Sequence, residues 1–176
     1  MYGTQVRKNF LVFLEERHLL STEQVNSLIA EIGRSPTSKI REILLKGALV
    51  SEENIYAAWA EYYGLPYIDL RATTFDPYAL ELISSEIARR NMLIPFNSFQ
   101  GEISVAFDNP DVNIVNQLKQ ITRCNILVHI ATRTGILEAI EIQYGEIDLQ
   151  AAAKNVDLSR YERALESREI AETKPI

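Results

Sequence analysis

Two stretches of similar sequence decide the fold, HLLSTEQVNSLIAE at residues 18–31 and ALVSEENIYAAWAE at residues 48–61. Serine and glutamate recur at the same places in both stretches, and apolar side chains keep the register. The same offset relates Leu14 to Leu44 further upstream. A duplicated helical hairpin has an apolar face that one copy cannot bury alone. We therefore expect the two copies to pack on each other, on a second domain or around a ligand.

The apolar spacing in this part of the chain predicts four helices within residues 1–64. Ser21 begins the second helix, and Gln24, three residues later, is its predicted capping-box partner. Ser51 begins the fourth helix, which ends at Gly64. The sequence therefore predicts an N-terminal subdomain made of two helical hairpins.

Residues 65–145 have a different pattern, which predicts elements in the order β-α-β-β-α-β-α. A short strand is expected at 67–70, followed by one helix that begins after Asp76. Strands at 93–99 and 102–107 are expected to form a hairpin, and a further strand is expected at 125–131. A last helix is predicted to begin at Thr132.

We therefore assign the chain to the α+β class. The expected domains are a four-helix subdomain at 1–64 and a small mixed sheet at 65–145, with helices on one side of it. Residues 146–176 contain few large apolar side chains. We expect this segment to be a linker or tail with at most one exposed helix.

The composition limits the chemistry that the chain can perform. Neither GxxxxGK[ST] nor GxGxxG occurs, which excludes a self-contained P-loop NTPase. The single cysteine, Cys124, excludes an internal disulfide, and the two histidines lack the spacing of a metal site. The net charge of −6 argues against nonspecific binding of nucleic acid. We expect no catalytic residue, no metal, no cofactor, no nucleic-acid partner and no insertion into a membrane.

Two clusters of side chains leave alternatives open. Five aromatic residues lie close together in the sequence, and they are Tyr56, Trp59, Tyr62, Tyr63 and Tyr67. They are suited either to stacking on a ligand or partner, or to packing the helical part against the sheet. The basic residues Lys39 and Arg41, with Arg34 nearby, either hold a phosphate or belong to a solvated turn.

The order of several motifs resembles the N-terminal domain of type II secretion and type IV pilus assembly ATPases. The motifs are LLSTEQVNSLIAE (19–31), KIREILLKGALVSEENIYAAWAEYYGLPYIDL (39–70), ARRNMLIPF (88–96), VAFDNPD (105–111) and LEAIEIQYG (137–145). The resemblance covers about residues 8–145. It implies an adaptor domain that has no catalytic activity and precedes an ATP-hydrolysing domain in the full-length protein.

In that family the domain docks the motor on the cytoplasmic domain of an inner-membrane platform protein. The resemblance therefore implies a cytoplasmic location, peripheral to the inner membrane, with the platform protein and the ATPase domain of the same chain as partners. We expect the partner-binding residues on the first helix, at Phe10, Phe13, Leu14 and Arg17. Another reading is an adaptor domain fused to something other than a secretion motor.

Some relatives instead bind cyclic di-GMP through a duplicated motif, RLGxxLVxxGxLxxxxLxxxLxxQ. This chain keeps the apolar positions of that motif and changes the polar ones. Asn9 and Lys39 stand at the arginine positions, Leu11 and Arg41 at the first glycine, His18 and Ala48 at the second glycine, and Ile32 and Tyr62 at the glutamine. Sensing of cyclic di-GMP is therefore the alternative function, with Lys39, Arg41 and Tyr62 as its expected ligand-binding residues.

Overall fold

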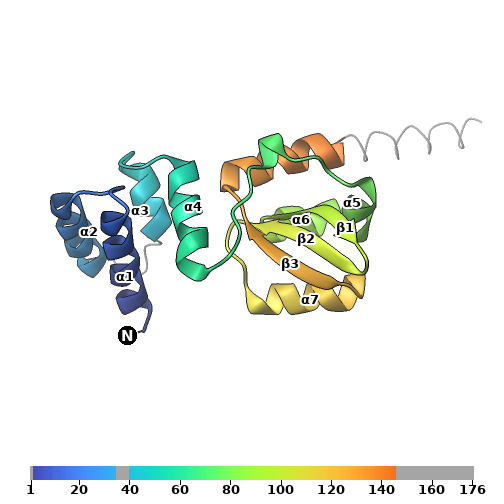
Figure 1. Ribbon diagram of the computed structural model, residues 1–176, viewed down its shortest axis with the longest axis horizontal. Helices are drawn as coiled ribbons and strands as arrows, with labels where there is room; N and C mark the ends of the chain where they lie inside the picture. Colours follow the sequence, from blue (N-terminus) through green and yellow to red (C-terminus); the bar gives the residue numbers. More distant parts are fainter. Residues whose placement is uncertain (1, 35–39, 146–176) are drawn as a thin grey trace, which may run out of the picture.

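The computed structural model describes residues 2–34 and 40–145 of the chain (Figure 1). Its first part consists of α1 (Tyr2–Glu16), α2 (Thr22–Arg34), α3 (Ile40–Lys46) and α4 (Glu52–Tyr63). The ends of α1 and α3, and the starts of α2 and α4, fall at equivalent positions of the sequence repeat. The duplication therefore builds two helical hairpins, as predicted. None of the described helices is long and apolar enough to cross a membrane.

The predicted helix caps are confirmed. The Ser21 hydroxyl accepts a hydrogen bond from the Gln24 backbone N–H (3.3 Å), and the Gln24 side chain accepts one from the Ser21 N–H (2.8 Å). This exchange is a capping box. Ser51 accepts from the Asn54 N–H (3.2 Å), and Gly64 ends α4 in the left-handed conformation with φ 66°.

The turns after α1 and α3 both pass through left-handed backbone at a residue other than glycine. His18 has φ 56° and Ala48, its counterpart, has φ 48°. The Leu19 N–H donates to the Leu14 carbonyl (2.9 Å), which closes the turn after α1. The two copies of the repeat therefore share the same left-handed turn, at residues that correspond in the sequence repeat.

The second part contains a three-stranded sheet and several helices. Its elements are η1 (Leu70–Ala72), α5 (Pro77–Leu82), α6 (Ser85–Asn91), β1 (Leu93–Phe99), β2 (Glu102–Phe107), α7 (Val112–Thr122), β3 (Asn125–Ile130) and a helix over residues 133–145. β1 pairs with β2 antiparallel, and β2 pairs with β3 parallel. The expected α+β class with a mixed sheet is confirmed.

Local chemistry explains several of these elements. Asp76 caps α5 with Pro77 in the first turn, and Thr132 accepts from the Gly135 N–H (3.0 Å) at the start of the last helix. Gln100 (φ 47°) and Gly101 (φ 80°) join β1 to β2. Two consecutive positive φ values suit the right-handed twist of a tight hairpin. The predicted hairpin is therefore confirmed.

Three details of the expected sheet region are wrong. Residues 67–70 do not form a strand, because Tyr67 makes only an isolated bridge to Ile130 and a 3-10 turn follows. The single helix expected after Asp76 is two helices, since Ile83 is extended and Ser84 caps α6. Finally, Ile103–Phe107 of the central strand are all buried, so both faces of that strand are covered.

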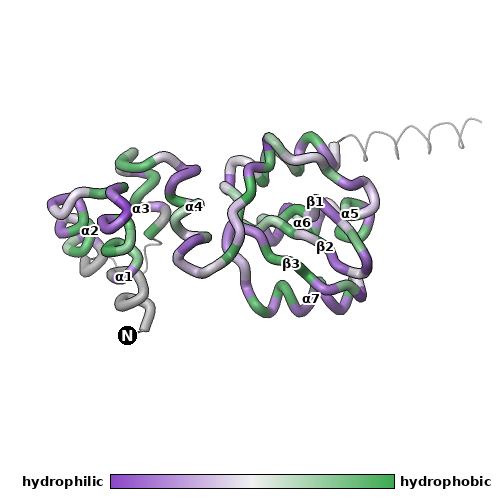
Figure 2. Tube along the Cα trace, in the orientation of Figure 1, coloured by the Kyte–Doolittle hydropathy of each residue, from purple (hydrophilic) through white to green (hydrophobic). Residues whose placement is uncertain are grey.

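Apolar side chains form one core within the helical repeat and another around the sheet. Figure 2 shows the alternation of apolar and polar residues along the helices that produces these cores. At the junction, the buried Tyr56 hydroxyl of α4 donates a hydrogen bond to Asp108, which also accepts one from Arg133 (3.2 Å). The Glu52 side chain accepts from the Thr134 N–H (3.2 Å). Specific polar contacts therefore join the repeat to the sheet.

We predict that Ala48→Gly stabilises the protein. Left-handed backbone costs an L-residue about 1–2 kcal/mol, and the greater freedom of glycine in the unfolded chain offsets about 0.4–1 kcal/mol of that gain. Chemical denaturation should show a free energy of unfolding higher by about 0.5–1 kcal/mol. The control is Ala57→Gly within α4, which should lower stability by about 1 kcal/mol. Equal losses in both variants would contradict the prediction.

We also predict that Tyr56→Phe lowers the free energy of unfolding by about 1–3 kcal/mol, because the Asp108 carboxylate loses a buried hydrogen-bond donor. Thermal and chemical denaturation measure this change. Tyr78→Phe is the matched control, since Tyr78 is 60% exposed on α5, and its effect should stay within about 0.5 kcal/mol. An unchanged stability of Tyr56→Phe would show that the hydrogen bond contributes nothing.

Candidate interaction surface on the helical repeat

Side chains of α1 and α4 form a continuous aromatic cluster, which consists of Phe10, Phe13, Trp59, Tyr62 and Tyr63. The ring centroids of Phe10 and Trp59 are 4.7 Å apart, and those of Phe13 and Tyr62 are 5.4 Å apart. Tyr63 continues the cluster, with its ring 4.9 Å from Trp59 and 5.1 Å from Tyr62. Most of these pairs meet edge to face, which is a favourable aromatic geometry.

The cluster runs from the core to the surface. Phe10 is fully buried, Phe13, Trp59 and Tyr62 are half-buried, and Tyr63 is 47% exposed. Aromatic side chains that are partly exposed and held by their neighbours are typical anchors in protein interfaces. The outer edge of the cluster is therefore a candidate contact surface.

Arg17 completes this surface at the end of α1. Its guanidinium carbon lies 5.1 Å from the centre of the Phe13 ring, and it forms an ion pair with Glu61 of α4. The guanidinium thus stacks on an aromatic ring and is oriented by a carboxylate. Both charged side chains are about half exposed, so the pair adds little stability by itself. The pair instead places two charged groups in fixed positions at the edge of the aromatic cluster.

The four residues that were expected to bind a partner differ in their exposure to solvent. Phe10 and Leu14 have no exposed surface, so the expectation that helix packing leaves them accessible is wrong. The reason is α4, whose Trp59 and Tyr62 cover this face of α1. Phe13 and Arg17 retain exposed surface.

Packing of the repeat against the sheet, one of the two alternatives, accounts for two of the five aromatic residues, and stacking on a ligand or partner stays a prediction. Tyr56 and Tyr67 pack the repeat against the sheet, through Asp108 and the bridge to Ile130 respectively. Burial, with the nearby Asp69 carboxylate as a second cause, raises the pKa of Tyr67. Trp59, Tyr62 and Tyr63 belong instead to the cluster beside α1.

In the described part of the chain, the residues at the positions of the cyclic di-GMP motif do not form a polar binding site. Leu11, which the sequence comparison placed at a glycine position of the motif, is fully buried. Tyr62, at a glutamine position, packs against Phe10 and Phe13. Lys39 and the side chain of Arg41 lie outside the described part of the chain, so their expected role stays a prediction.

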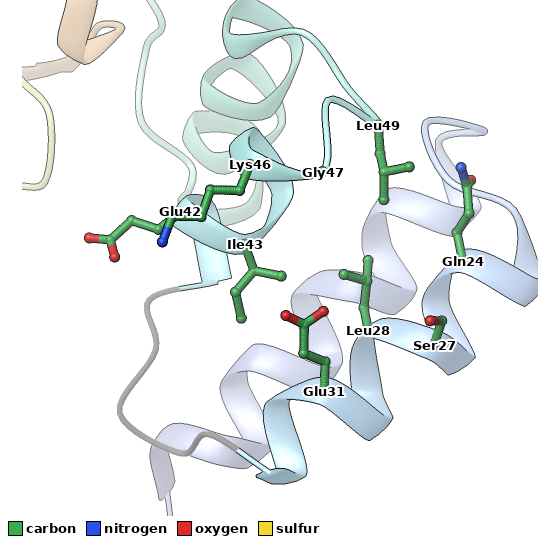
Figure 3. Close-up of a pocket in the computed structure, with 9 residues that line it drawn as sticks. All are labelled: Gln24, Ser27, Leu28, Glu31, Glu42, Ile43, Lys46, Gly47 and Leu49. Atoms are coloured by element: carbon green, nitrogen blue, oxygen red, sulfur yellow. The ribbon is translucent and has the colours of Figure 1, made fainter.

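A groove between α2 and α3 was missed from the sequence (Figure 3). It has a volume of about 440 Å³, within the range of sites that hold small ligands. Its lining combines apolar and polar side chains, which are Gln24, Ser27, Leu28, Glu31, Glu42, Ile43, Lys46, Gly47 and Leu49. The signal that predicts it is the repeat itself, since Gly47 stands where the first copy has Arg17.

The described residues contain no group of three or more histidine, cysteine, aspartate or glutamate side chains arranged to hold a metal. Shifted pKa values occur away from the repeat. The Arg71 guanidinium, which binds both oxygens of Glu138 at 3.0 and 3.1 Å, lowers the pKa of that carboxyl. Burial raises the pKa of Tyr144, whose hydroxyl donates to the Ile83 carbonyl (2.6 Å). These shifts have structural causes, an ion pair and burial.

Two solved structures share this fold of helical hairpins followed by a small mixed sheet. A structure of MshE with cdg (cyclic di-GMP) superposes with a TM-score of 0.66 at 19% identity, covering 77% of this chain and 98% of that one. The N-terminal domain of XpsE gives a TM-score of 0.59 at 22% identity, covering 79% of this chain and 94% of that one. At these identities the similarity establishes the fold.

The MshEN domain family matches residues 42–148, and the chain belongs to this family. It is also similar to two type IV pilus assembly ATPases named PilB. The protein from Myxococcus xanthus is 28% identical over 76% of this chain, and that from Thermus thermophilus is 26% identical over 74%. The chain spans only 24% and 15% of their lengths. The resemblance drawn from the sequence is thus confirmed.

Proposed function

We propose that the chain is the non-catalytic adaptor domain of a type II secretion or type IV pilus ATPase. In this role it docks the motor onto the cytoplasmic domain of an inner-membrane platform protein and is located in the cytoplasm, peripheral to that membrane. Its membership of the MshEN family and its similarity to the PilB ATPases support this proposal. The ATPase domain of the same full-length protein is the second expected partner.

The observation that carries the docking role is the partly exposed aromatic cluster bordered by Arg17. Phe13, Tyr62 and Tyr63 offer rigid apolar surface, and Arg17 is already oriented by Glu61. A partner therefore gains contacts without having to order these side chains. Phe10 and Leu14 support the surface from below, because they are buried.

We further propose that residues 1–64 and 65–145 act as two subdomains, with 146–176 as a linker. The separate cores of the repeat and the sheet support the first division. The linker lies outside the described residues. Under this proposal the repeat makes the external contact, and the junction at Tyr56 and Asp108 passes the resulting force to the sheet.

Replacing Tyr63 with alanine should weaken the complex with the platform protein's cytoplasmic domain about fivefold or more, because interface tyrosines commonly contribute more than 1 kcal/mol. Biolayer interferometry measures the dissociation constant. The control is Tyr78→Ala, which removes an exposed tyrosine from the sheet region and should leave binding unchanged. Equal affinity of both variants would reject the surface, and no complex with the unaltered chain would reject the docking role.

Sensing of cyclic di-GMP is the second candidate, supported by the similarity of the fold to the structure of MshE with cdg and by the equivalent left-handed turns at His18 and Ala48. Against it, Leu11 fills a glycine position, and neither Asn9 nor Tyr62 offers the polar group of the motif. We therefore predict that calorimetric titration with cyclic di-GMP gives no saturable heat at micromolar concentration. Saturable heat would establish the sensing function and make docking secondary.

A further inference from the structure

The groove between α2 and α3 is the counterpart, in the sequence repeat, of the filled interface between α1 and α4. The same offset relates Gly47 to Arg17, Ile43 to Phe13, and Glu31 to Glu61. The three residues on the groove side all line the pocket. The α1–α4 interface, which we use as a template, therefore shows which side chains occupy the equivalent positions when the space between the helices is filled.

In the template, an arginine occupies the space between the two helices. Arg17 lies over Phe13 and pairs with Glu61. In the groove, Gly47 contributes no side chain, while the carboxylate that corresponds to Glu61 is retained as Glu31. Figure 3 shows Glu31 pointing from α2 into the groove, toward Ile43. Among the described residues, the groove thus keeps the carboxylate of the ion pair and has glycine at the position of its arginine.

The remaining lining suits the aliphatic stem of a long cationic side chain. Leu28, Ile43 and Leu49 form an apolar floor, and Leu49 is 39% exposed. Lys46 extends along α3 toward Glu42, away from Glu31 (Figure 3). The apolar side chains of the groove therefore lie beside an exposed carboxylate, Glu31, an arrangement that matches methylene groups followed by a positive charge.

We propose that the α2–α3 groove accepts an arginine side chain presented by a partner protein. The guanidinium takes the place that Arg17 holds in the first copy and binds the Glu31 carboxylate. Arginine fits better than lysine because its planar fork forms two parallel hydrogen bonds with a carboxylate. The partner is thus defined by its chemistry, as a protein segment with an exposed arginine beside apolar side chains.

That the partner is the platform protein rests on the proposed function. The arginine site itself is argued from the groove alone and does not depend on that function. A groove that binds arginine in a chain that forms no platform complex would reject the docking function alone. A platform complex that is insensitive to every groove substitution would reject the groove alone.

The test is an NMR titration of the isotope-labelled 176-residue chain with N-acetyl-arginine N-methylamide. We expect the amide signals of Glu31, Ile43, Gly47 and Leu49 to shift and saturate, with a dissociation constant on the order of 1 mM for so small a ligand. The citrulline analogue has nearly the same shape without the charge. It should bind about tenfold more weakly.

Two variants locate the site. Glu31→Gln should weaken arginine binding about threefold, the size expected for an exposed ion pair, whereas Glu23→Gln, another exposed carboxylate on the same helix, should leave it unchanged. Gly47→Arg should abolish binding by filling the groove from within. Its backbone φ is not in the left-handed range, although a Cβ meets the Leu49 side chain at 3.3 Å. If Gly47→Arg does not fold, the affinity of Glu31→Gln for the arginine ligand alone decides whether the groove is the site.

Three results would overturn the proposal. The first is equal binding of arginine and citrulline, and the second is an unchanged affinity in Glu31→Gln. The third concerns a second copy of this chain as the occupant. Self-association that Gly47→Arg removes, measured by sedimentation velocity, would assign the groove to contacts between copies.

Discussion

The hydrogen bond between Tyr56 and Asp108 joins the core of the repeat to the core of the sheet. Tyr56 lies on α4, in the repeat, while Asp108 follows the central strand of the sheet. Arg133, at the start of the last helix, binds the same carboxylate. One buried acid therefore connects the second hairpin, the sheet and the last helix. This polar junction, together with the packing of Ile130 of β3 into the core of the repeat, fixes the orientation of the repeat relative to the sheet, since buried hydrogen bonds tolerate little displacement.

The repeat itself is symmetric in its backbone and asymmetric in its side chains. Both copies have the same turns, with left-handed residues at His18 and Ala48. Their facing surfaces differ, because the first copy is filled by Phe13 and Arg17 whereas the second is hollow at Gly47. Duplication supplied one scaffold twice, and side-chain substitution gave each copy its own surface. The two copies therefore have the same backbone arrangement but present two chemically different surfaces, the α1–α4 cluster and the α2–α3 groove.

Local signals explain which features were predictable from the sequence. The caps at Ser21 and Ser51 and the hairpin at Gln100–Gly101 depend on a few neighbouring residues, and all were predicted. The break between α5 and α6 was missed because apolar spacing continues through it, which hides the cap at Ser84. Burial of Phe10 depends on α4, distant in sequence, and so was not predictable from the periodicity of α1. The groove does not follow from the similarity of the two copies, because it arises where they differ, with Gly47 in place of Arg17.

The mixed pairing of the sheet also orders the assembly of the chain in time. β1 and β2 are joined by a two-residue turn, so their antiparallel pairing closes a very short loop. β3 runs parallel to β2 and reaches it only after α7 has formed the crossover. The contacts of β3 with Tyr67 and α4 follow, because that edge exists only once β3 is in place. During synthesis the repeat emerges first, but it acquires its final position only after residues near 130 have been made. In that interval the surface of α4 that contacts β3 is exposed to other proteins.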